Sequence, residues 1–213
     1  MKCYLLLFML GMGILSQAQS PENVELDTIS DSIHKNYQLG FQVGKNFTWF
    51  RNGSDPRSSD KIANGHGVRL GIHLDYKLNN WLSMIPAAEL NFNNSKVTFH
   101  DEENVPYESH MSPVVFHFMT YLKLKLPVDK YSPYLILGPD YRLPMAANEP
   151  SGRNYGYSRD IAADVGLGFW FKIGPISIAP EIRYSYGFVS VSRDPLIGPA
   201  YHHQIFAGIR ISG

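Results

Sequence analysis

The sequence predicts an all-β fold, an eight-stranded antiparallel up-and-down transmembrane β-barrel. Three observations predict it. The chain opens with a short apolar segment of the kind that directs export. Apolar and polar residues then alternate with period two through eight runs, and long and short connections alternate between the runs. Outer-membrane barrels combine these features, so we expect the chain to lie in the bacterial outer membrane.

The first part of the chain is not expected to belong to the barrel. A basic start and an apolar run over residues 4–15 precede small residues that end at Ala18. This order is typical of a secretory signal peptide, here residues 1–18, and the run is too short to cross a bilayer as a helix. Residues 19–36 show no clear period and are interpreted as a periplasmic N-terminal extension. Residues 37–213 are left for the barrel.

Composition excludes several other classes of protein. The single cysteine, Cys3, lies in the predicted signal peptide, so the exported chain has no thiol for a disulfide or a cysteine metal site. Lys and Arg number 19 and Asp and Glu also 19, so no excess positive charge attracts nucleic acid. No later stretch offers about 18 consecutive apolar residues, as a membrane-spanning helix requires. We expect no cofactor and no nucleic-acid partner.

The first four runs each separate an apolar face from a polar one. Residues 37–49 place aromatic and aliphatic side chains at odd positions and Gly, Gln and Asn at even ones. Residues 68–78 oppose aliphatic residues to Arg, His, Asp and Lys. Two asparagines at 79–80 form a tight turn into residues 82–92, whose even positions are apolar. Residues 112–126 set Val, Phe and Leu against His and Lys. Each run therefore predicts a strand.

The last four runs repeat the pattern. In residues 135–143, Leu and Tyr oppose Gly, Asp and Arg. Residues 161–173 are apolar at odd positions, and Gly-Pro at 174–175 turns the chain into residues 176–188, where Ile, Tyr and Phe oppose Ser, Glu and Arg. Residues 204–212 oppose Ile and Ala to Gln, Gly, Arg and Ser. Eight is an even number of strands, which can close into an antiparallel barrel.

The lengths of the connections support the same topology independently. Long connections are expected near residues 51–65, 94–111, 146–159 and 189–202. Short connections are expected near residues 79–80, 127–132 and 174–175. Outer-membrane barrels have long extracellular loops and short periplasmic turns in this alternation.

A lipocalin-like soluble barrel would show the same alternation, but three features favour lipid on the apolar side. The apolar faces are long, aromatic residues gather near strand ends, and the polar face is rich in Gly and charge. In the first run only Lys45 breaks the apolar face. The apolar side chains are therefore expected to face lipid.

The polar face carries both signs of charge and would fill a narrow lumen. Buried charges are tolerated as paired, hydrogen-bonded networks, so we predict a plugged, salt-bridged lumen. The residues expected to form structural lumen ion pairs are Arg69, Asp75, Asp164, Glu181, Arg183 and Arg210. Further lumen residues are expected to be His73, Lys77, Glu89, Lys123, Asp140 and Arg142.

Catalytic and metal sites have little support in the sequence. The adjacent His202 and His203 would point to opposite faces of a strand and so would not share a metal ion. Residues 100–110 contain several acids and imidazoles, but loops are commonly polar and no catalytic motif accompanies them. No catalytic, cofactor-binding or metal residue is predicted.

Several segments carry a family resemblance. They are GVRLGIHLDYKLNNWLS at 67–83, YLKLK at 121–125, PYLILGPDY at 133–141, DVGLGF at 164–169 and, most specifically, PEIRYSYG at 180–187. With them, residues 37–213 resemble the PorT-family outer-membrane barrels of the Bacteroidetes. The resemblance implies a non-enzymatic accessory component of type IX protein secretion or gliding motility. Its expected partners are outer-membrane lipid and other secretion or envelope proteins.

Two alternative functions stay open. An adhesion or surface-binding barrel would act through its extracellular loops, so loop deletion would abolish binding and leave secretion intact. A small barrel enzyme acting on lipid or peptide would carry clustered acids, His or Ser at the extracellular rim.

Overall fold

The structure is a computed structural model that describes residues 36–52, 61–62, 64–100, 106–110, 113–126, 132–145, 159–191 and 199–213. The predicted signal peptide, and the predicted extension up to residue 35, lie outside these residues. Within them, no helix is long and apolar enough to cross a membrane.

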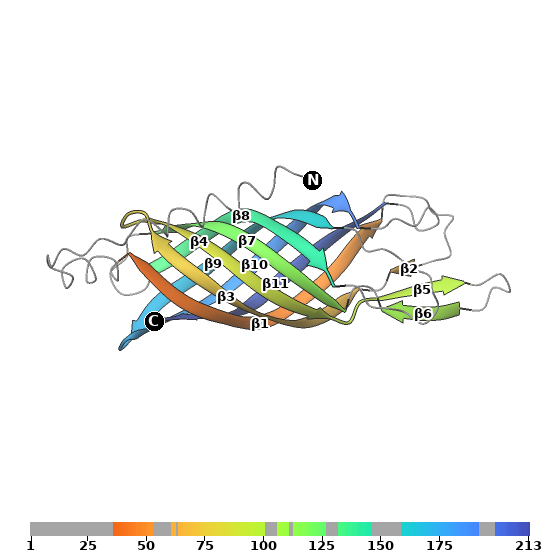
Figure 1. Cartoon of the computed structure of the whole chain (residues 1–213), viewed down its shortest axis with the longest axis horizontal. Helices are drawn as coiled ribbons and strands as arrows, with labels where there is room; N and C mark the ends of the chain where they lie inside the picture. Colours follow the sequence, from red (N-terminus) through yellow and green to blue (C-terminus); the bar gives the residue numbers. More distant parts are fainter. Residues whose placement is uncertain are drawn as a thin grey trace, which may run out of the picture. The chain divides into compact units, whose positions relative to one another are not determined.

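Eight of the described strands close into an antiparallel barrel (Figure 1). They are β1 (Tyr37–Asn52), β3 (Gly65–Lys77), β4 (Leu82–Asn93), β7 (Val114–Lys125), β8 (Ser132–Pro144), β9 (Asp160–Ile173), β10 (Ile176–Ser190) and β11 (Ala200–Ser212). Each pairs with its neighbours in the sequence, and β1 pairs with β11 to close the barrel. The predicted fold class is confirmed.

The closing seam between β1 and β11 has an unbroken register, from Gly40 opposite Ser212 to Asn52 opposite Ala200. The backbone N–H of Gly213 continues the seam by donating to the carbonyl of Leu39 at 3.2 Å. Both strands extend further toward the long connections than the alternating runs indicated, because the last residues of β1 pair with the first residues of β11 across the seam.

Two of the predicted long connections, near residues 51–65 and 94–111, contain short strands of their own. These connections contain β2 (Lys61–Ile62), β5 (Lys96–His100) and β6 (Pro106–His110), which form a separate three-stranded antiparallel sheet in the order β2-β5-β6. Such runs of two to five residues are too short to stand out as alternating patterns. They form strands because they pair with one another.

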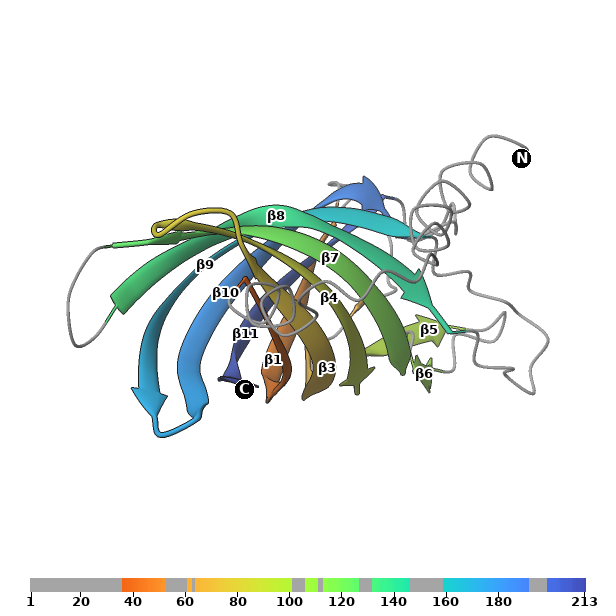
Figure 2. The same ribbon diagram turned by 60° about the vertical axis from the view of Figure 1, so that its left-hand side comes forward.

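The outer wall of the barrel is apolar. Side chains from all eight strands are exposed there, and Leu39 and Ile72 keep 64% and 63% of their surface accessible. Figure 2 shows the neighbouring strands β1, β3 and β4 running together along this wall. Charged side chains occupy the lumen instead, among them Arg69, Asp140 and Asp164, all fully buried. An apolar outer wall around a charged lumen is the arrangement of a membrane barrel. A soluble barrel that binds an apolar ligand would have the reverse arrangement.

The three hairpins with short turns share a proline in their second strand. Pro86 of β4, Pro139 of β8 and Pro180 of β10 lie on the outer face. Next to each proline the pairing with the preceding strand skips two residue pairs and then resumes without a shift in register. Proline has no N–H, so the carbonyl opposite it receives no ladder hydrogen bond from that position. Each short hairpin therefore contains one local gap in its ladder.

The lumen also contains an apolar cluster. Ile85 of β4, Tyr121 of β7 and Ile136 of β8 are fully buried there, and Tyr134 and Met119 pack with them. Gly168 of β9 makes room for this packing, since a Cβ at that position would meet the ring of Tyr134. The interior is thus filled by apolar contacts as well as by charge.

Candidate functional site: a buried ion-pair network in the lumen

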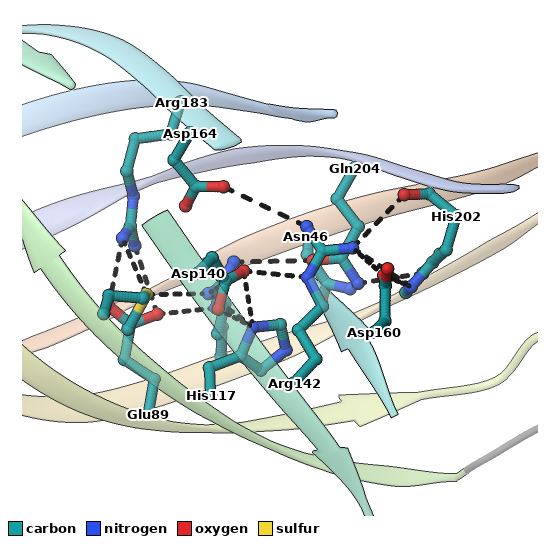
Figure 3. A network of polar contacts seen from close by, with 12 residues as sticks. Asn46, Glu89, His117, Asp140, Arg142, Asp160, Asp164, Arg183, His202 and Gln204 are labelled. Carbon is teal, nitrogen blue, oxygen red and sulfur yellow. Dashed lines mark hydrogen bonds and ion pairs between the residues drawn. The ribbon is translucent and has the colours of Figure 1, made fainter. Parts of the chain in front are cut away.

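Glu89 of β4 binds two arginines of the charged network, and Figure 3 shows it beside Arg183. Its carboxylate accepts hydrogen bonds from both terminal nitrogens of Arg183, Nη1 at 3.1 Å and Nη2 at 3.2 Å. Arg69 Nε lies 2.5 Å from the same carboxylate, and the side-chain amide of Gln42 also donates to it. All four side chains are buried. A buried carboxylate is costly alone, and this forked pairing with two guanidinium groups offsets the cost.

Arg183 links Glu89 to the neighbouring strands. Its Nη1 donates to the hydroxyl of Tyr121 at 2.6 Å, and that hydroxyl donates in turn to Asp164 Oδ2 at 2.7 Å. The ring of Phe206 lies beneath the two arginines, 4.2 Å from Arg183 Cζ and 5.7 Å from Arg69 Cζ. These cation–π contacts let an apolar ring fill the space beside charged groups.

A second group of charges lies toward the long connections. Asp140 contacts Arg142 Nε at 2.8 Å and His117 Nδ1 at 2.9 Å, and Arg142 Nη1 reaches Asp160 at 2.8 Å. Arg142 also donates to the backbone carbonyl of His202 at 3.2 Å. Arg69 Nη2 lies 2.9 Å from His117 Nδ1 and joins this group to Glu89.

A third group lies toward the short turns. Glu181 Oε1 is 3.0 Å from Arg183 Nε, and Glu181 Oε2 is 3.2 Å from Arg210 Nη2. Tyr134 donates its hydroxyl to Glu181 at 2.9 Å. Lys123 and Asp75 form a separate buried ion pair.

The structure brings together only part of the predicted ion-pair set. Glu181 contacts both Arg183 and Arg210, as described above. The other three predicted residues form ion pairs outside the set: Arg69 with Glu89, Asp75 with Lys123, and Asp164 with Arg142. All six side chains are buried in the lumen. Of the further lumen residues expected from sequence, Lys77 is half-buried at its strand end and the others are buried.

Sequence reasoning missed several members of the network. Asp160 lies one residue before the alternating run that predicted β9, so it was outside the expected strand. Phe206 is an aromatic residue at an inward position between Gln204 and Gly208, and this exception to the polar face was the available signal. The pairing of Glu89 with two arginines had no local signal, because it depends on contacts with the neighbouring strand β3 and, across the lumen, with β10.

The network leaves no solvent-accessible space at its level. One residue from each of the eight barrel strands is at most 2% exposed: Asn46, Arg69, Glu89, His117, Asp140, Asp164, Arg183 and Phe206. A water-filled channel would expose some of these side chains. The described lumen is therefore packed shut by side chains, as the dimensions of an eight-stranded barrel favour.

The two adjacent histidines occupy different environments. His202 faces the lumen, where its ring stacks on Phe50 with centroids 4.8 Å apart. His203 is covered by outward-facing aromatic residues. Its ring stacks on Trp49 with centroids 5.9 Å apart, and its Nδ1 is hydrogen-bonded to the Tyr184 hydroxyl at 3.1 Å. Among the described residues, no group of three or more His, Cys, Asp or Glu side chains is placed to hold a metal ion.

Comparison with known proteins agrees with this geometry. Residues 17–193 match the family model of the outer membrane protein beta-barrel domain. The chain belongs to this family. It is therefore an outer-membrane protein. A search of curated proteins found no match to its sequence. Its localisation and its closed barrel are thereby established together.

Several solved structures of small outer-membrane proteins are similar to this chain. Neisserial surface protein A is similar over 81% of this chain and 96% of its own, with 13% sequence identity and a TM-score of 0.51. OprG of Pseudomonas aeruginosa covers 83% of this chain and 94% of its own, at 11% identity and a TM-score of 0.48. The attachment invasion locus protein Ail of Yersinia pestis covers 84% and 99%, at 12% identity and 0.41. The likeness to Neisserial surface protein A extends to the fold alone.

Proposed function

We propose that this protein is a non-enzymatic, non-conducting outer-membrane barrel that serves as a structural or accessory component of the envelope. The observation that carries the proposal is the packed lumen, in which fully buried Arg69, Asp140 and Arg142 occupy the space that a pore would need. With the lumen closed, the surfaces open to partners are the loops, the periplasmic turns and the lipid-facing wall.

Conductance across planar bilayers tests the closed lumen. Wild-type protein is expected to give no regular single-channel steps, because side chains fill the cross-section. A known porin in the same bilayers shows that insertion is detectable. Reproducible steps from the wild-type protein would contradict the proposal.

The accessory role we favour is in type IX protein secretion or gliding motility. It is supported by the resemblance of residues 37–213 to PorT-family barrels, carried most specifically by residues 180–187. The partners would then be other secretion or envelope proteins. Deleting the gene in the bacterium that encodes it should reduce the amount of secreted cargo in the medium, and the wild-type gene should restore it. Normal secretion after deletion would remove this role and leave the closed-barrel proposal standing.

An adhesion or surface-binding role is the second candidate, and the sheet β2-β5-β6 favours it. This sheet is built entirely from two of the long connections, which outer-membrane barrels place on the cell surface. Replacing residues 96–110, which contain β5 and β6, with a short turn separates the two roles. Lost attachment with normal secretion would identify an adhesin, whereas lost secretion with normal attachment would identify the accessory role.

A further inference from the structure

A lysine lies within the apolar part of the lipid-facing wall. Lys45 of β1 is exposed on the outer face, between the apolar outward residues Val43 and Phe47. It lies four positions before Trp49, which corresponds to about 10 Å along the barrel axis at about 3.3 Å per residue and a tilt of about 40°. Lys45 therefore lies well below the aromatic residues at the loop end of the wall. A charge at that depth is expensive in lipid unless it reaches a polar partner.

The barrel itself offers Lys45 no carboxylate. Its partners in register are Val68 on β3 and Ala207 on β11. All six acidic residues of the described barrel strands are buried in the lumen: Asp75, Glu89, Asp140, Asp160, Asp164 and Glu181. A second copy of the chain would meet Lys45 with the same described wall, which presents no acid.

Two more basic residues lie on the outer wall between Lys45 and the loop end of the barrel. Arg51 is exposed on the same outer face of β1, six residues closer to the loop end. His66 of β3 is exposed on the same face and pairs in register with Phe47, between the levels of Lys45 and Arg51. These three residues form a strip that rises from Lys45 to the rim. We call it the basic strip.

We propose that the basic strip binds an anionic phosphate group of an outer-leaflet lipid. The four-carbon stem of Lys45 can extend along the apolar wall and raise its ammonium group toward the interface. The small side chain of Ala207 leaves space beside it for a lipid chain. Arg51 then supplies a second cation to the same phosphate layer from above. A lipid fits this strip better than a protein carboxylate, because the basic residues line up along the path of a lipid from interface to core.

Lipid retention in nanodiscs tests the proposal. Full-length exported protein is placed in phosphatidylcholine nanodiscs that contain a minor fraction of diphosphorylated lipid A, and native mass spectrometry measures the lipid A retained after release. Lys45→Met is expected to lower retention about tenfold, the effect of one charge-assisted contact. Lys45→Arg should retain lipid A. Lys172→Met, which removes an exposed lysine at the opposite end of the barrel, is the matched control.

Three results would overturn the proposal. The first is equal retention by wild type and Lys45→Met, when both give the compact unboiled gel band of a folded barrel. The second is release of lipid A by excess inorganic phosphate, which would indicate a site for the free anion. The third is a discrete protein adduct from a photo-crosslinker placed at position 45 in cells, which would identify a protein partner in place of lipid.

Discussion

At the scale of single residues, the lumen network depends unequally on its members. Glu89 is the carboxylate shared by Arg69 and Arg183, and both guanidinium groups are buried. Glu89→Ala leaves two buried cations short of their partner. We expect it to lower the free energy of unfolding by about 3–5 kcal/mol. Urea titration of the protein in detergent micelles measures the change.

The control for that measurement is Lys172→Ala, an exposed charge at a strand end, which is expected to change stability by less than about 0.5 kcal/mol. A Glu89→Ala protein as stable as the wild type would show that the ion pairs do not hold the lumen together. Combining Glu89→Ala with Arg183→Ala in a double-mutant cycle measures the interaction free energy between these two side chains.

Glu181 provides a graded comparison. Glu181→Ala removes the carboxylate of Arg210, but Arg183 keeps its two hydrogen bonds to Glu89. The expected loss is about 3 kcal/mol, at or below the lower end of the range for Glu89→Ala. The same urea titration ranks the two variants. A larger loss of unfolding free energy for Glu181→Ala than for Glu89→Ala would show that the ion pairs near the short turns contribute more to stability.

At the scale of secondary-structure elements, replacing a proline in one of the three proline-containing hairpins should stabilise the barrel. Pro139 lies opposite Thr120 at one of the gaps in the ladder, and it cannot donate to the Thr120 carbonyl. Pro139→Ala supplies an N–H at that position. We expect an increase of about 1 kcal/mol in the free energy of unfolding, the usual net effect of one hydrogen bond. An unchanged urea midpoint would show that lipid-side packing at Pro139 matters as much as the missing bond.

These prolines also shape the outer wall. An apolar groove of about 480 Å³ lies over β3, β4, β7 and β8, with Pro86, Pro139 and Phe118 among its lining residues. Replacing Pro139 alters this groove as well as the ladder. Comparing Pro139→Ala with Pro180→Ala, whose gap lies outside the groove, separates the two effects.

The elements show where sequence reasoning succeeds and where it stops. Period-two alternation is a local property, so all eight barrel strands could be found from it, and the positions facing the lumen followed from the same count. The partner of each lumen charge is a non-local property. Arg69 pairs with Glu89 and Asp75 with Lys123 because of barrel closure and side-chain length, which alternation does not encode. The short strands β5 and β6 were missed because five residues are too few for an alternating pattern to stand out.

At the scale of the whole barrel, closure predicts resistance to detergent. Every barrel strand has two hydrogen-bonded neighbours, so the described barrel has no free edge at which unfolding can begin. The membrane-extracted protein should run as a compact band on a gel when unboiled and shift to its full apparent mass when boiled. Fractionated membranes should carry it in the outer membrane. An identical position with and without boiling would contradict a closed barrel in that extract.

The seam between β1 and β11 makes the order of strands cyclic. Gly213 and Leu39 are hydrogen-bonded neighbours, so a short linker could join residue 213 to residue 36 without stretching the barrel. New ends could then be opened in the connection between β8 and β9. Such a circular permutant should regain the same compact band, because every strand keeps both of its neighbours. The barrel is then defined by the cyclic order of its strand pairs, and not by the position of its termini. Termini placed in a long connection would allow a probe to be attached at the cell surface.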